Sequence, residues 1–209
     1  LVHFAVDTDE VYMTTKVSGQ STYFLHFNKG DGSGRGNPEN PTGYKTAYLW
    51  EEVLARDSLM DILARFLHLH VDERTLGTKV IRKETMIFPR YHQLRCVRKL
   101  ISKTQADGAG NSYLVQHSAG SGKSNSIAWL AHRLASLHNA QDERIFSSIV
   151  VITDRLVLDQ QLQNTIFQFE HKAGWVQKID TDSTQLADAL NAGVPIIITT
   201  LQKFPFVIE

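Results

Sequence analysis

One octapeptide holds the residue types that bind phosphate: residues 117–124 read His-Ser-Ala-Gly-Ser-Gly-Lys-Ser. Small residues let successive backbone N–H groups face an anion, and a helix that begins after them adds the partial positive charge of its N-terminus. In such a loop Lys123 would reach the β- and γ-phosphates, and the hydroxyl of Ser124 would ligate Mg²⁺. The sequence therefore predicts a nucleotide site with Mg²⁺, formed by Ser118, Ala119, Gly120, Ser121, Gly122, Lys123 and Ser124.

The flanks of this loop favour the same interpretation, although the usual pattern begins with glycine and this one begins with His117. An apolar run predicts a strand over 113–116, and helical spacing predicts a helix over 124–138. Its expected core-facing stripe is Ile127, Leu130, Leu134 and Leu137. The alternative is a glycine-rich strand-to-helix turn that binds no ligand.

The rest of the C-terminal half alternates between the periods of strands and helices. After a helix over 91–103, the pattern predicts strands over 113–116, 149–153, 175–179 and 195–200, separated by helices over 124–138, 155–167 and 184–192. Continuously apolar strands in such an order are typical of a parallel sheet covered on both faces. The expected fold class is α/β.

The N-terminal half has a different organisation. Strands are expected within residues 1–27, followed by a Gly-, Asn- and Pro-rich loop over 28–46. Helices are expected over 48–55 and 58–70, and 71–88 is interpreted as a linker. Asp57 and Ser58 are expected to cap the second helix, whose predicted buried face is Leu59, Ile62, Leu63, Phe66 and Leu67.

Composition sets the outer limits on function. Apolar residues make up 42% of the chain, enough for a core, and 22 basic residues balance 22 acidic ones, so net charge favours no polyanionic partner. The single cysteine, Cys96, fits a reducing cytoplasm. No apolar run approaches the roughly 18 residues of a membrane span, and no signal peptide is visible. The strand-like first residues without a Met suggest a fragment of a longer protein.

Positive charge is concentrated in one segment. Residues 82–103 hold seven basic residues and one acidic residue, Glu84, a local excess of six. Arg95, Lys99 and Lys103 follow helical spacing, so they form either a solvated helix face or part of a binding surface. The nine histidines show no spacing with acids or cysteines that predicts a metal site.

Several short motifs together resemble the R subunit, which combines motor and nuclease, of type I restriction enzymes. The matching segments span almost the whole chain: 27–30 (FNKG), 36–38 (GNP), 48–54 (YLWEEVL), 57–59 (DSL), 65–66 (RF), 88–94 (FPRYHQL), 117–124, 153–155 (TDR) with 158–160 (LDQ), and 199–203 (TTLQK). A loop that begins with His117 is also similar to this family's variant. The loop alone is generic, whereas the combination of GNP, YLWEEVL and RYHQ is specific.

The resemblance implies a superfamily 2 helicase-like lobe that moves along double-stranded DNA with ATP and Mg²⁺. It implies that Gln93 reads the adenine edge, which offers a donor and an acceptor. It further implies that Thr153, Arg155, Thr199 and Lys203 contact the DNA backbone at the carboxyl ends of strands. The implied partners are double-stranded DNA and the methyltransferase and specificity subunits of the restriction complex.

The same resemblance implies three parts. Residues 1–70 would be the C-terminal part of an endonuclease domain with an α+β fold, 71–88 a linker, and 89–209 the first RecA-like motor lobe. No aspartate-glutamate box follows Thr200, and no nuclease-spaced acids and lysine occur in 1–70. The fragment is therefore expected to bind ATP and to hydrolyse it poorly.

Two other classes of function stay open. Asp154 follows an apolar strand about thirty residues after Lys123, which is also the position of a Mg²⁺-holding acid in small-molecule P-loop kinases. Alternatively, the chain is a non-catalytic adaptor that docks a partner through the loop over 30–43.

Overall fold

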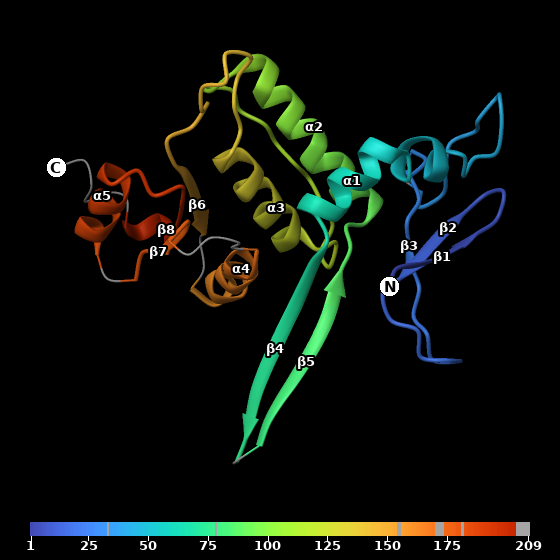
Figure 1. The fold of residues 1–209 in the computed structure, drawn as a ribbon, viewed down its shortest axis with the longest axis horizontal. Helices are drawn as coiled ribbons and strands as arrows, with labels where there is room; N and C mark the ends of the chain where they lie inside the picture. Colours follow the sequence, from blue (N-terminus) through green and yellow to red (C-terminus); the bar gives the residue numbers. More distant parts are fainter. Residues whose placement is uncertain (33, 78, 154–155, 170–173, 181, 204–209) are drawn as a thin grey trace. The chain divides into compact units, whose positions relative to one another are not determined.

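The computed structural model describes residues 1–32, 34–77, 79–153, 156–169, 174–180 and 182–203, and it divides the chain into two compact units. The first unit spans residues 1–95 and the second spans 96–209 (Figure 1). The division falls inside helix α2 (Tyr91–Asp107) rather than in the expected linker. Within the described ranges, no helix is both long and apolar enough to cross a membrane.

The first unit begins with an antiparallel meander, as the alternating residues predict. Its strands are β1 (His3–Val6), β2 (Val11–Thr14) and β3 (Leu25–His26), and β2 lies between the other two. Val11 and Met13 of β2 are buried. They point to one face because successive strand residues alternate, so this face carries the core of the unit.

An aromatic cluster fills that core and joins motifs that are distant in sequence. Phe27 packs against Phe4 and Tyr91 with ring centroids 5.3 and 6.0 Å apart, and Tyr48 meets Tyr91 at 5.1 Å. Tyr48 donates a 2.8 Å hydrogen bond from its hydroxyl to the carbonyl of Phe27. Burial is the main cause that raises the pKa of Tyr48, so this hydroxyl stays protonated and donates.

Asn37 ties the long loop to the meander. Its carbonyl oxygen accepts from the backbone N–H of Lys29 at 2.8 Å, and its amide donates to the Asp9 carbonyl at 2.9 Å and to Asn28 at 3.0 Å. Asn28 in turn accepts from the N–H of Val11 at 2.7 Å. The Gly- and Asn-rich motifs therefore brace the backbone of this unit, because the side chains of Asn28 and Asn37 hydrogen-bond to backbone groups of other segments.

The two helices expected next are shorter than predicted. A π-helix, η1 (Leu49–Val53), precedes α1 (Arg56–Arg65). The prediction of caps at Asp57 and Ser58 was wrong: the N-cap residue is Ala55, without a side-chain cap, and the Ser58 hydroxyl donates to the Val53 carbonyl at 2.8 Å. Leu63 is 48% exposed, whereas Ile62 and Phe66 are fully buried, so the buried face is narrower than expected.

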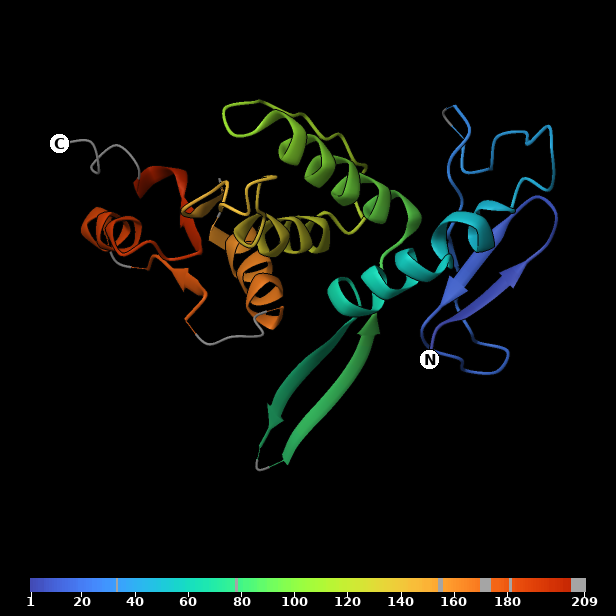
Figure 2. The ribbon, with the colours of Figure 1, turned by 45° about the horizontal axis from the view of Figure 1, so that its top comes forward.

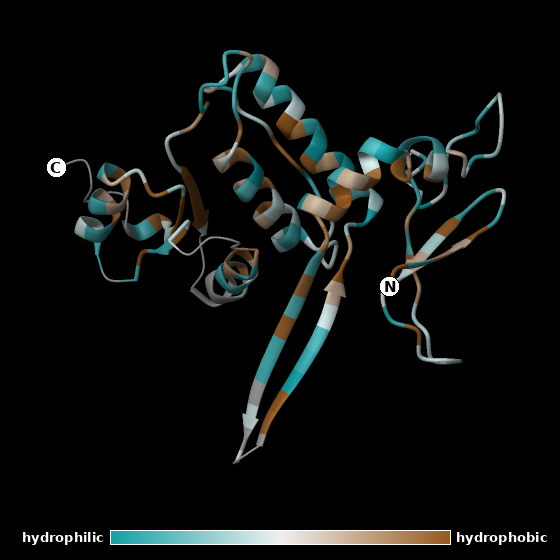
Figure 3. Cartoon of the chain, in the orientation of Figure 1, coloured by the Kyte–Doolittle hydropathy of each residue, from teal (hydrophilic) through white to brown (hydrophobic). Residues whose placement is uncertain are grey.

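The segment interpreted as a linker forms a long hairpin instead. Strands β4 (His68–Leu76) and β5 (Lys79–Ile87) pair antiparallel along their full length. Figure 3 shows hydrophilic and hydrophobic stretches alternating along both strands. The prediction failed because charged residues such as Glu73 and Arg82 resemble linker composition, although opposite charges at paired positions suit a two-stranded ribbon.

The second unit contains the predicted parallel sheet. The described strands are β6 (Ile149–Thr153), β7 (Val176–Lys178) and β8 (Ile196–Thr200), in the order β6-β8-β7. All five residues of β8 are buried, so the central strand is covered on both faces. β6 is apolar from Ile149 to Ile152, as its brown colour in Figure 3 shows. The α/β prediction is confirmed for this unit.

Helices α3 (Lys123–Ala135), α4 (Leu156–Gln168) and α5 (Ser183–Asn191) alternate with the strands as expected. α3 and α4 lie side by side (Figures 1 and 2). Trp129 of α3 packs edge-on against Phe169 at 5.6 Å. Asp182 is the N-cap residue of α5, and its carboxylate accepts from the N–H of Gln185 at 3.0 Å. Gly193 follows the end of the helix with a positive φ of 65°.

Two predictions for this unit were wrong. The buried face of α3 consists of Ser126, Ala128, Trp129, Ala131 and Ala135. Ile127 is 38% exposed, because small residues let the helix approach its neighbours more closely than the larger aliphatic stripe would.

The predicted strand over 113–116 is absent from the described structure, and Leu114 is 96% exposed. Polar side chains hold this segment near the end of α2. The hydroxyl of Tyr113 donates to the Asp107 carboxylate at 3.1 Å, and Asn111 donates to the Asp107 carbonyl at 3.3 Å. A short apolar run becomes a strand only when another strand pairs with it.

Candidate nucleotide-binding site

The predicted phosphate loop leads directly into α3, which begins at Lys123. Gly122 is the N-cap residue, in the left-handed conformation with φ 79° and ψ 37°, and Gly120 also has a positive φ, 73°. L-residues with a side chain rarely adopt such angles. The two glycines of the motif are therefore needed for the shape of the backbone where the loop turns into the helix.

The first turn of α3 offers hydrogen-bond donors. Among the described residues, the backbone N–H groups of Lys123 and Ser124 have no acceptor, and no side chain caps the helix. The N–H groups of Asn125 and Ser126 only share the carbonyl of Gly122, at 3.2 and 3.3 Å. Free donors and the helix dipole together favour an anion at this position.

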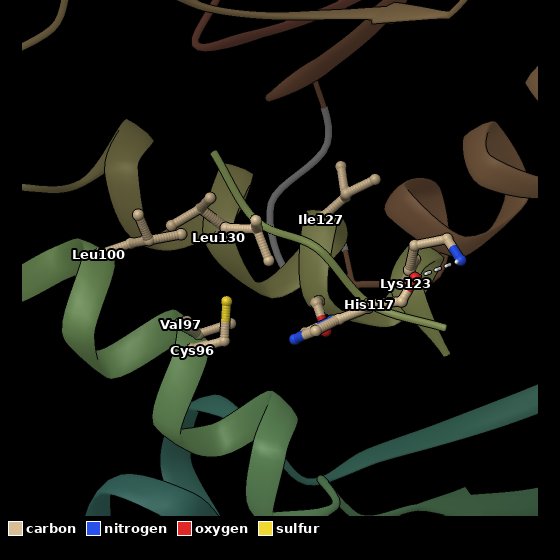
Figure 4. Close-up of a pocket in the computed structure, with 9 residues that line it drawn as sticks. Cys96, Val97, Leu100, His117, Lys123, Ile127 and Leu130 are labelled. Carbon is tan, nitrogen blue, oxygen red and sulfur yellow. Dashed lines mark hydrogen bonds between the residues drawn. The ribbon is translucent and has the colours of Figure 1, made fainter. Parts of the chain in front are cut away.

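Lys123 is folded back over the loop in this conformation. Its ammonium donates to the carbonyls of Ser118 at 2.9 Å and His117 at 3.3 Å, the second of which is drawn in Figure 4. The residue is exposed, so it needs no repacking of the core to turn toward a ligand. The neighbouring Ser124 is partly exposed.

The residues of the loop fit a Mg²⁺ ion that is held jointly by the protein and the phosphates of a nucleotide. The described residues contain no group of three or more His, Cys, Asp or Glu side chains arranged to hold a metal ion. Mg²⁺ is commonly held by one or two protein groups plus substrate phosphates and water. The hydroxyl of Ser124 could be one such group, so the ion would depend on the nucleotide.

The structure brings two of the predicted DNA contacts close together. Thr153 ends β6 and pairs in register with Thr200, and Ile152 pairs with Thr199. Thr153 is partly exposed, whereas Thr199 is 1% exposed. A DNA phosphate in this conformation would therefore reach Thr153 more readily than the Thr199 hydroxyl.

The predicted contacts at Arg155 and at the side chain of Lys203 lie outside the described residues, as does Asp154. Thr153 and Thr199 belong to the carboxyl ends of neighbouring parallel strands, where ligands collect on open α/β sheets. In Figure 1, α3 begins on the side toward which the arrow of β6 points. The roles of these side chains in binding DNA stay predictions.

Gln93 is buried, unlike an ordinary surface glutamine. It is 3% exposed, and its side-chain oxygen accepts from the backbone N–H of Arg90 at 2.9 Å. A glutamine at the third position that reaches back to the cap residue is half of a capping box. Gln93 therefore stabilises the start of α2, and its contact with adenine stays a prediction.

Sequence reasoning missed a pocket of about 120 Å³ beside the phosphate loop. Helix α2 contributes Cys96, Val97 and Leu100, and α3 contributes Ser126, Ile127 and Leu130 (Figure 4). His117, Lys123 and Val115 complete the lining. The sequence contained a signal for it, because Ile127 and Leu130, two of the four aliphatic residues predicted to face the core, line this pocket.

The fold and the loop together define an α/β protein with a phosphate-loop sequence at the N-terminus of a helix. Comparison with known families gives a more specific result: residues 92–207 match the family model described as SWI2/SNF2 ATPase. This match covers more than half of the chain, and the chain belongs to the SWI2/SNF2 ATPase family. The family indicates an ATP-using, helicase-like protein. No curated protein and no solved structure matches the chain.

Proposed function

We propose that this chain binds ATP and Mg²⁺ at residues 117–124 and belongs to the R subunit of a type I restriction enzyme, in which ATP drives movement along double-stranded DNA coupled to cleavage. The observation that carries the proposal is the start of α3. Its free N–H groups, its left-handed Gly122 and the adjacent Lys123 supply the chemistry of phosphate binding. Membership in the SWI2/SNF2 ATPase family supports ATP as the nucleotide.

Each residue has one role in the proposed site. Lys123 leaves the carbonyls of His117 and Ser118 and pairs with the β- and γ-phosphates. The backbone N–H groups of the loop and of the first turn of α3 hold the phosphate oxygens. Mg²⁺, when bound at Ser124, neutralises phosphate charge. Because the ammonium only exchanges acceptors on the surface, binding requires no change in the core.

Calorimetry with Lys123→Ala tests the nucleotide site. We expect ATP affinity to fall about 10- to 150-fold, the range for a hydrogen bond that involves charged groups, about 1.5–3 kcal/mol. Circular dichroism should be unchanged, because the side chain is exposed. Lys99→Ala on the exposed face of α2 is the matched control and should bind ATP as the native chain does. Unchanged ATP affinity in Lys123→Ala would refute the site.

Salt dependence tests the proposed DNA contacts. Contacts with phosphates release counterions, so affinity for duplex DNA should fall steeply with salt. Replacing Arg155 and Lys203 together with Ala should reduce the slope of log K against log salt by roughly two, about one per lost contact. The reduction should be equal on unrelated duplexes, since movement along DNA must be independent of sequence. An unchanged slope, or a loss on one sequence only, would argue against these contacts.

An assay of DNA-stimulated ATP hydrolysis distinguishes the proposed motor from the two other candidate functions, a small-molecule kinase and a non-catalytic adaptor. A small-molecule kinase would be stimulated by its acceptor substrate and not by DNA, and an adaptor would show no hydrolysis. The assay is made on the complete restriction complex, in which the motor is proposed to act.

A further inference from the structure

The pocket between α2 and α3 contains a polar group that phosphate binding does not use. Ser126 lines the pocket and is 8% exposed, and its hydroxyl oxygen is fully buried without a hydrogen-bond partner in the described structure. Buried hydroxyl groups are normally paired, because an unpaired one loses its hydration without compensation. The unsatisfied hydroxyl and the cavity beside it are two independent observations that indicate a ligand.

The remaining lining sets the chemistry of that ligand. Val97, Leu100, Ile127 and Leu130 give the pocket an apolar wall. Cys96 also lines it, and burial raises the pKa of this thiol, so the group is neutral at neutral pH. The ammonium of Lys123 is directed to loop carbonyls. A charged ligand would therefore lose its hydration against a mostly apolar wall.

We propose that this pocket binds a small neutral ligand of the phenol class, with an apolar ring against α2 and α3 and a hydroxyl group hydrogen-bonded to Ser126. The volume of about 120 Å³ is close to the roughly 150 Å³ of an apolar protein cavity that takes up benzene. Entry is possible past Val115 and Ile127, which are 43% and 38% exposed. The hydroxyl can both donate to and accept from the serine.

Occupancy of the pocket should also affect the phosphate loop. His117 and Lys123 belong to both the pocket and the loop. A ligand that fits the pocket stabilises the conformation in which Lys123 is bound to the loop carbonyls, and so it opposes the movement toward phosphate. Phenol should therefore weaken ATP binding, and ATP should weaken phenol binding by the same factor. This second step rests on the proposed function, whereas binding of phenol does not.

The single cysteine of the chain provides the assay. Cys96 lines the pocket and is the sole cysteine of the sequence, so its rate of alkylation by iodoacetamide reports occupancy. Phenol should slow alkylation of the chain in a saturable manner, and toluene should do so more weakly. In Ser126→Ala, the half-saturating phenol concentration should rise about three- to tenfold, the contribution of one neutral hydrogen bond, while protection by toluene is retained.

Two control variants define the result. Ser102→Ala makes the same chemical change on the exposed face of α2 and should leave phenol protection unchanged. Ile127→Trp places a larger side chain at the partly exposed mouth and should remove protection by both ligands. The absence of saturable protection in the native chain, or equal phenol protection in Ser126→Ala, would overturn the proposed site.

ATP titrations distinguish the two proposals. A higher Kd for ATP in saturating phenol supports the coupling, and an unchanged Kd overturns the coupling alone. Failure of ATP to bind without phenol would overturn the proposed function while saturable protection of Cys96 still supports the pocket.

Discussion

Replacing Gly120 with alanine tests whether the left-handed backbone of the loop is needed for binding ATP. Gly120 has φ 73°, and a Cβ added there would meet no atom within 4 Å. Gly120→Ala therefore introduces no clash, and its effect comes from backbone strain alone, about 1–2 kcal/mol for a residue with a side chain in the left-handed region. The loop can relieve this strain by turning to a negative φ, which would misdirect its N–H groups.

The chain offers a closely matched control. Gly108 has φ 75°, and a Cβ added there would also meet open space, but this glycine lies after α2 and outside the phosphate loop. By urea denaturation, both Ala variants should lose about 1–2 kcal/mol of unfolding free energy. By calorimetry with excess Mg²⁺, Gly120→Ala should bind ATP about 10- to 150-fold more weakly, the loss of one charge-assisted hydrogen bond. Gly108→Ala should bind ATP normally.

Equal ATP affinity in the two variants would refute the reasoning, because strain in the loop would then have no effect on the site. An equal loss in both variants would refute it as well, since the loss would follow stability rather than the position of the glycine.

The remaining predictions concern helix α2 and the face of α3. Gln93→Ala should weaken the binding of ATP by roughly 1–3 kcal/mol, the range for buried polar partners left unpaired, and should leave the affinity for GTP unchanged. An equal loss of affinity for both nucleotides in calorimetry would contradict a role in reading adenine. Trp129→Ala should lower the free energy of unfolding by about 3–5 kcal/mol, because the ring is 1% exposed. Ile127→Ala, at a residue 38% exposed, should lose much less in the same denaturation series, and equal losses would contradict the observed orientation of α3.

Periodicity predicted the elements of the second unit well. The strands ending at Thr153 and Thr200 lie where apolar spacing indicated, and α2 begins at the predicted Tyr91 but continues to Asp107, past the predicted end at residue 103. Spacing did not identify the buried side of α3, because alanines at 128, 131 and 135 contribute little hydrophobicity but allow close packing. Apolar spacing also wrongly predicted a strand over 113–116. Three apolar residues form a strand only where the fold places another strand beside them.

The sequence indicates which residues form the candidate site, and their binding of a nucleotide stays a prediction. The sequence does not indicate their conformation, because the folded-back ammonium of Lys123 depends on carbonyls whose positions are set by the turns at Gly120 and Gly122. The motifs also did not distinguish structural from functional residues. Asn37 belongs to the specific motif GNP, yet the three hydrogen bonds described for its side chain link segments of the first unit.

The strand order of the second unit has a consequence for synthesis. β8 is the last described strand in the chain, yet it lies at the centre of the sheet and makes every strand pairing recorded for β6 and β7. During synthesis, β6 and β7 therefore emerge from the ribosome before the strand that pairs with them. Until residues 196–200 follow, their apolar side chains and backbone groups are exposed, which favours aggregation of such nascent chains. The unit should thus acquire its sheet in one late step, and ribosome-bound chains that end before Ile196 should remain sensitive to protease.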